Sequence, residues 1–133
     1  MTNRAVELHD SQLLGTSWEG PDLVFRMSGY LHVTDGQPGC APGTGWTQDA
    51  DLRVTRGALV ASPRESLWIR DGTIQTEEQT FNNLLPLPFD HQGRIVVKFR
   101  GVECELHATG TGIALTLLGS PVFVEDVPAH DEP

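Results

Sequence analysis

Turn-forming dipeptides divide this chain into segments of about ten residues each, and this spacing is typical of a sheet built from many short strands. The signals are Glu19-Gly20-Pro21-Asp22, Arg56-Gly57, Asp71-Gly72, His91-Gln92-Gly93, Arg100-Gly101, Gly110-Thr111 and Gly119-Ser120-Pro121. Between them, apolar and polar residues alternate with a period of two, and no long segment carries the helical period. The sequence therefore predicts an all-β, antiparallel sandwich or flattened barrel of eight to ten strands, with at most one short helix.

The strand pattern is clearest in residues 23–34 and next strongest in residues 94–118, whereas residues 49–55 and 6–18 show it less strongly. In residues 23–34 every second residue is apolar, except that Gly29 takes one apolar position, which indicates a bend or close packing. Residues 49–55 alternate in the same way, so that Ala50, Leu52 and Val54 are expected to point inward. Residues 6–18 are expected to form one broken strand or two.

The turn signals also predict specific strand pairings. Two-residue loops at Arg100-Gly101 and Gly110-Thr111 place Phe99 opposite Val102 and Ala108 opposite Ile113. Asp71-Gly72 is a favoured hairpin turn and places Ile69 opposite Ile74. A helix start is expected at residues 62–65, and residues 77–85 are a second helix candidate.

Length and composition predict a single domain. The chain has 133 residues, of which residues 1–124 are expected to form one β domain and residues 125–133 an acidic tail without Lys or Arg. No apolar run approaches the roughly 18–20 residues that span a membrane, and no secretion signal is recognisable, so we expect a cytoplasmic protein without membrane contact. In that compartment Cys40 and Cys104, the latter expected in a buried strand position, favour free thiols.

The charge balance excludes one class of partner and favours another. Eighteen acids and nine bases give a net charge of −9, with Lys98 the only lysine. Such a chain repels phosphate backbones, so we expect no nucleic-acid binding. An acidic surface can steer a basic protein partner, or it can simply keep the domain in solution. Nothing in the sequence decides between a monomer and a homodimer.

Two polar groups are candidate sites. Tyr30 and His32 share the polar side of one strand, and Asp49 and Asp51 share the polar side of another. If these strands pair, the four residues could perform acid–base chemistry or bind a metal ion; otherwise they form a solvated surface patch. His107 with Glu103 and Glu105 offers the same two interpretations.

A glycine- and proline-rich loop over residues 35–46 ends in Trp46 and contains Cys40. A large aromatic residue after such a loop could be a lid or a contact anchor, or it could pack under the edge of the sheet. Cys40 has no base nearby in the sequence, so no catalytic role is assigned to it.

Near the start of the chain, His9, Asp10 and Ser11 carry the residue types of a catalytic triad. Consecutive strand residues point to alternate sides, so His9 and Ser11 are expected on one side and Asp10 on the other, which excludes a triad. The segment Glu7–Ser11, with Trp18-Glu19-Gly20 and the strand that follows, resembles small bacterial β proteins that open with these residues. Some of those are similar to immunity proteins of toxin systems, which implies a cytoplasmic protein that neutralises a toxin through an acidic surface.

The leading hypothesis is a non-catalytic module that binds a protein partner, through the group Tyr30, His32, Trp46, Asp49 and Asp51, and needs no cofactor. One alternative is a barrel that binds a small apolar molecule in a cavity lined by Phe25, Met27, Leu31 and Phe99. The other alternative is a metal-dependent enzyme that uses one of the histidine–carboxylate groups.

Overall fold

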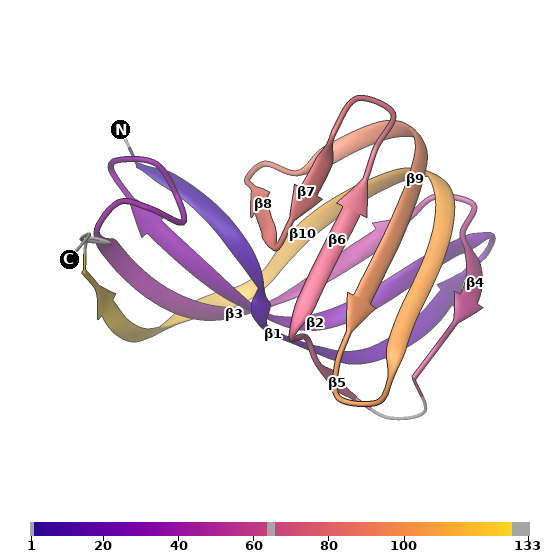
Figure 1. Ribbon diagram of the computed structural model, residues 1–133, viewed down its shortest axis with the longest axis horizontal. Helices are drawn as coiled ribbons and strands as arrows, with labels where there is room; N and C mark the ends of the chain where they lie inside the picture. Colours follow the sequence, from indigo (N-terminus) through magenta and orange to yellow (C-terminus); the bar gives the residue numbers. More distant parts are fainter. Residues whose placement is uncertain (1, 64–65, 129–133) are drawn as a thin grey trace.

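The computed structural model describes residues 2–63 and 66–128, which form ten strands and no helix (Figure 1). The strands are β1 (Asn3–Glu19), β2 (Asp22–Thr34), β3 (Gly43–Val54), β4 (Ala58–Ala61), β5 (Leu67–Trp68), β6 (Asp71–Gln75), β7 (Thr80–Asn82), β8 (Leu84–Pro86), β9 (Asp90–Arg100) and β10 (Glu105–Val127). Their antiparallel pairing gives a strongly curled sheet, so the prediction of an all-β flattened barrel is confirmed. In the described part of the chain, no helix is available to span a membrane.

The sheet curls until its two ends meet. The strands follow the order β5-β1-β2-β3-β10-β9-β6-β7. β7 pairs with β6, whereas β8, which follows one residue later, pairs with β1. The segment from Thr80 to Pro86 therefore joins β6 to β1, near the two ends of the curl.

Asn83, the residue between β7 and β8, makes this connection through four hydrogen bonds. Its backbone N–H donates to the Gly72 carbonyl, and its own carbonyl accepts the N–H of Leu8, both at 2.8 Å. Its side-chain Oδ1 accepts the Gly72 N–H at 2.7 Å, and its Nδ2 donates to Asp71 Oδ1 at 2.8 Å. Asn83 has a φ of 61°, a conformation that asparagine tolerates better than most residues.

The curled sheet encloses one continuous apolar core. Its largest fully buried side chains include Phe25, Phe89, Phe99, Leu8 and Met27. Phe81 and Phe89 pack edge to face, with 5.1 Å between their ring centroids. Burial of these side chains supplies the main driving force for the fold.

Beyond this core, β1, β2, β3 and β10 continue as a twisted four-stranded extension, seen at the left of Figure 1. The extension contains the first residues of β1 and β3 and the last residues of β2 and β10, as the pairs Ala5↔His32 and Glu125↔Gly45 show. Tyr30 and His32 are buried there, although their alternation with Leu31 predicted an exposed polar side. The long strands thus bury both of their sides along this stretch.

A large bulge in β1 separates the two regions. Glu7 pairs with Tyr30 and Gln12 pairs with Ser28, so four residues of β1 lie opposite Gly29 alone. Ser11, fully buried, fills the bulge: its hydroxyl donates to the Glu7 carbonyl at 2.7 Å and accepts the Tyr30 N–H at 2.9 Å. The hydroxyl replaces the ladder bonds that the bulge removes.

The structure confirms the strands predicted at residues 23–34 and 49–55. β2 and β3 include the predicted segments, and Ala50, Leu52 and Val54 point into the core. Residues 6–18 belong to one strand interrupted by the bulge, rather than to two. β3 begins at Gly43, so the loop that was predicted over residues 35–46 ends at residue 42.

The predicted pairing of β9 with β10 is wrong. Phe99 lies opposite Leu106, because the connection comprises residues 101–104 and not the pair Arg100-Gly101. Glu103 adopts a φ of 57° in this wider turn, and Cys104 is exposed instead of buried. β10 then continues through Gly110-Thr111 without turning, so Ala108 does not lie opposite Ile113 but opposite Val97.

Two other predictions are wrong, and a third lies partly outside the described residues. Asp71 and Gly72 lie inside β6, which pairs with β9 and not with the segment that holds Ile69. Residues 77–85, predicted as a helix candidate, hold β7 and most of β8 instead. These two strands pair with β6 and with β1. The predicted helix start at 62–65 falls partly on residues 64–65, which lie outside the described residues.

β10 extends to Val127, three residues past the boundary expected at residue 124. Glu125, Asp126 and Val127 pair with Gly45, Thr44 and Gly43 of β3. The first part of the expected acidic tail is therefore strand, and residues 129–133 lie outside the described residues.

Replacing Asn83 with alanine tests its role in joining the ends of the sheet. We expect Asn83→Ala to lower the free energy of unfolding by about 2–3 kcal/mol, because it leaves a buried Gly72 N–H without its acceptor and places alanine at a positive φ. Urea denaturation measures the change. The exposed neighbour supplies a control, Asn82→Ala, expected to cost less than about 0.5 kcal/mol. Equal stability of the two variants would contradict this role for Asn83.

Candidate functional site

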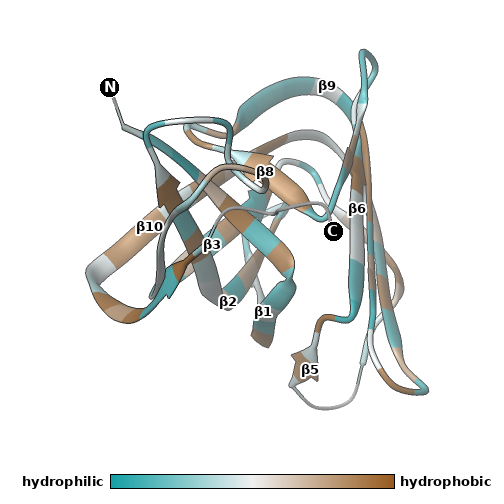
Figure 2. Cartoon of the chain, turned by 60° about the vertical axis from the view of Figure 1, so that its left-hand side comes forward, coloured by the Kyte–Doolittle hydropathy of each residue, from teal (hydrophilic) through white to brown (hydrophobic). Residues whose placement is uncertain are grey.

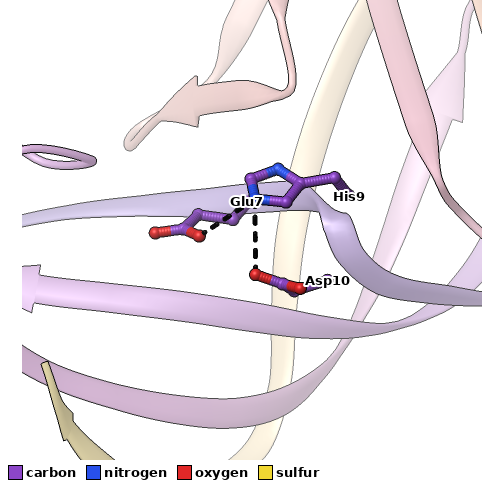
Figure 3. A group of neighbouring side chains, drawn as sticks. All are labelled: Glu7, His9 and Asp10. Atoms are coloured by element: carbon purple, nitrogen blue, oxygen red, sulfur yellow. Dashed lines mark ion pairs between the residues drawn. The ribbon is translucent and has the colours of Figure 1, made fainter.

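The β1 bulge brings together three side chains that could hold a cation. Figure 3 shows the imidazole of His9 between the carboxylates of Glu7 and Asp10. His9 Nε2 lies 3.6 Å from Glu7 Oε1 and 3.4 Å from Asp10 Oδ2. In a regular strand Asp10 would point away from His9, as the sequence predicted; the extra residues of the bulge turn it to the same side. Ser11 is buried, so no triad forms.

This group forms one wall of an acidic pocket of about 500 Å³. The bulge residues face the end of β10, and two loops complete the rim. The lining residues are Glu7, His9, Asp10, Tyr30, Gln37, Pro38, Gly39, Cys40, Asn82, Asn83, Leu84, Glu125, Asp126, Val127 and Pro128. Among these described residues there are four carboxylates and no lysine or arginine, so the pocket has a negative potential.

Tyr30 spans the space between the two acidic walls. Its ring passes over Gly45, where an added Cβ would collide with the phenol. Its hydroxyl donates to Glu125 Oε2 at 2.7 Å. Burial raises the pKa of Tyr30 well above its ordinary value, and the hydrogen bond to Glu125 and the charges of Glu125, Glu7 and Asp10 raise it further.

His32 supports the pocket from beneath. It is buried, and its Nδ1 accepts the backbone N–H of Gly39 at 2.7 Å, which holds the loop that forms one rim. An accepting Nδ1 carries no proton, so its 3.8 Å separation from Glu7 Oε2 is not a hydrogen bond from the imidazole. His32 thus positions the loop that carries Cys40.

Asp49 and Asp51 do not join Tyr30 and His32. β2 and β3 pair as the site hypothesis required, but the register places Asp51 opposite Arg26 and Asp49 opposite Ser28. Arg26 Nε donates to Asp51 Oδ1 at 2.6 Å, which engages that carboxylate in a surface ion pair. Tyr30 lies opposite Thr47 instead. The predicted four-residue group is therefore divided along the strand pair.

Trp46 packs as a structural residue. It is half-buried against the core, its Nε1 donates to Thr44 Oγ1 at 2.8 Å, and its ring meets Phe123 edge to face at 5.3 Å. The interpretation that Trp46 packs near a sheet edge fits these contacts better than a lid. Phe123, which is not among the predicted site residues, is half-exposed beside it.

The second predicted histidine group is also divided. His107 lies in β10 opposite Lys98, whereas Glu103 belongs to the turn before that strand. Across the residues that the structure describes, the group of potential metal ligands within 4.8 Å of one another is Glu7, His9 and Asp10. The sequence does not show the bulge, because Leu13 and Leu14 are both apolar and Leu14 continues the even-numbered pattern of Val6 and Leu8. Only the burial of Leu13 and the exposure of Leu14 reveal the change.

The side chains predicted to line an internal cavity fill the core instead. Phe25, Met27, Leu31 and Phe99 are at most 2% exposed and belong to the continuous apolar cluster. None of them lines the acidic pocket.

Because Tyr30 is the only tyrosine, its ionisation can be followed by phenolate absorbance. The folded state favours the neutral phenol, so this group stabilises the fold below its unfolded pKa of about 10 and loses that effect as the pH rises further. We expect the phenolate to appear well above pH 10 in the folded protein and near pH 10 in urea. Glu125→Gln should move the folded transition toward 10, and Tyr30→Phe should weaken the alkaline loss of stability. A folded transition at the ordinary value would contradict the described environment.

In comparisons with known proteins, no family model, no curated protein and no solved structure matches this chain. The resemblance of its opening residues to small bacterial β proteins therefore stays a prediction.

Proposed function

We propose that this chain is a non-catalytic β module that binds a protein partner by taking a basic side chain into the acidic pocket. The observation that carries the proposal is the lining of the pocket: Glu7 and Asp10 on one wall and Glu125 and Asp126 on the other, with no lysine or arginine among the described residues that line it. A guanidinium group can donate to carboxylates on several sides at once, which suits an arrangement of this kind.

The pocket combines short-range and long-range attraction. Single exposed ion pairs contribute little, so affinity depends on several carboxylates acting on one cation. The net charge of −9 raises the rate at which a basic partner meets the domain. Val122, Phe123 and Val124 are exposed at 63%, 50% and 47% and supply apolar contact area directly before Glu125.

The proposal includes the setting predicted from the sequence. Binding of a basic toxin in the cytoplasm, as the resemblance to immunity proteins implies, would use this acidic surface, with the module as a monomer or a homodimer. Cys40 and Cys104 are both free and exposed, which suits a reducing compartment. The filled core favours this interpretation over a small molecule held inside the barrel.

A divalent cation bound by Glu7, His9 and Asp10 is a second candidate function. Ligands about 2.1 Å from a tetrahedral ion lie about 3.4 Å from one another. The separations of 3.4 Å and 3.6 Å around His9 Nε2 are close to that value. Such a site would have three protein ligands and an open position.

The test uses a capped synthetic peptide of about eight residues in which arginine alternates with valine. We call it the Arg-Val peptide. Calorimetry should show binding that weakens about tenfold in the double variant Asp10→Asn/Glu125→Gln, because two carboxylates are lost. The control Glu78→Gln/Asp90→Asn changes the net charge equally at exposed positions outside the pocket and should retain binding.

Zinc chloride distinguishes the second candidate in the same assay. Zinc binding that His9→Ala abolishes, without any binding of the Arg-Val peptide, would replace the proposed function by the metal site. Peptide binding that is equal in the two double variants would contradict the pocket as its location.

A further inference from the structure

One edge of β10 has no strand beside it over the second half of its length. β9 pairs with β10 as far as Ala114, and the N–H of Leu115 donates to the Phe89 carbonyl at 3.0 Å. β3 occupies the other edge of β10 as far as Val127. Among residues 2–63 and 66–128, no further strand pairs with β10 on the side of β9, so its final residues form a margin of the sheet (Figure 1).

This margin carries apolar side chains that the core does not use. Figure 2 shows hydrophobic colouring along the outer part of β10. Val122, Phe123 and Val124 are consecutive and exposed, so they present apolar groups on both sides of the strand. Proteins usually protect open edges with charge, proline or a bulge, because unpaired backbone groups can accept another strand. Here a first bulge, Gly119 to Pro121 opposite Gln48, lies directly before the apolar residues, and a second bulge residue, Val124, lies within them.

We propose that the open edge of β10 over residues 122–127 accepts an extended segment of the protein partner as an additional strand. The segment has apolar residues beside Val122–Val124 and a basic residue that reaches the acidic pocket. This inference rests on the proposed function, and it adds that the partner binds as an extended strand. Backbone hydrogen bonds would then give affinity, and the charged pocket would give specificity.

Charge complementarity identifies the occupant. Glu125 and Asp126 follow the apolar residues on the same strand, and both also line the pocket, whose opposite wall holds Glu7 and Asp10. An added strand that runs beside residues 122–127 therefore passes from an apolar to an acidic environment. A second copy of this chain paired through the same edge would bring Glu125 and Asp126 of that copy beside the same carboxylates, and like charges repel. A basic segment of another protein fits this edge better than a second copy does.

Amide hydrogen exchange, read residue by residue, tests the inference on the full chain. In the free protein, the amides of residues 117–127 that face the open edge should exchange fast. With saturating Arg-Val peptide they should exchange at least about tenfold more slowly, as expected when backbone hydrogen bonds form. The matched probe is the same peptide with proline in place of one central valine, which keeps the charge but cannot complete a strand. Its affinity should be lower by about tenfold or more, because several hydrogen bonds are lost.

The outcomes separate this inference from the proposed function. If the Arg-Val peptide binds through Asp10 and Glu125 but no amide of residues 117–127 gains protection, the added strand is wrong and the pocket remains the site. If the proline peptide binds equally well, the added strand is also wrong. If the edge is protected without peptide, in step with dimer formation in analytical ultracentrifugation, the occupant is a second copy. If the peptide does not bind at all, the proposed function and this inference both fail.

Discussion

The hydroxyl of Ser11 holds together the part of the molecule on which its surface chemistry depends. It bonds to the Glu7 carbonyl and the Tyr30 N–H inside a bulge in which four residues of β1 lie opposite one of β2. The bulge changes which positions of β1 point inward, so Leu8 and Leu13 are both fully buried although one number is even and the other odd. The same change turns Asp10 toward His9 and Glu7.

The bulge lies next to the place where the sheet closes. Leu8, inside the bulge, donates its N–H to Asn83, which also bonds to Gly72 of β6. Asn83 and its two neighbours then line the acidic pocket. The site is therefore built where the first strand meets the bridging segment, and its geometry depends on contacts between residues far apart in the chain. Asn83 therefore belongs both to the connection between β1 and β6 and to the pocket.

The sequence predicted what depends on local patterns. The alternation in residues 23–34 and 49–55 identified β2 and β3 and their buried residues, because one side of each strand must meet the core. It could not predict the β9–β10 register, because a two-residue and a four-residue turn keep the same side chains inward. Tyr30 and His32 were assigned to an exposed side for a similar reason: the four-stranded extension and the loop held by His32 cover them only after long-range folding.

The candidate site was missed because it arises from an irregularity. A regular strand separates Asp10 from His9, and the adjacent apolar residues Leu13 and Leu14 leave the change of phase after Leu8 invisible in the sequence. Conversely, Asp49 and Asp51 lie on the expected strand, but the register gives Asp51 to Arg26. For Asp49 and Asp51 the strand was predictable and the partner across the sheet was not, whereas for Asp10 even the side of the strand was not predictable.

The most direct test of this account is the variant Ser11→Ala, compared with Ser17→Ala at an exposed position of the same strand. The account predicts that Ser11→Ala lowers the free energy of unfolding by about 1–3 kcal/mol, because a buried N–H loses its acceptor. It also predicts that the variant, measured while folded, binds the Arg-Val peptide more weakly, and that Ser17→Ala changes neither quantity. A Ser11→Ala protein with unchanged stability and unchanged peptide affinity would contradict the claim that this hydroxyl holds the bulge and the acidic site together.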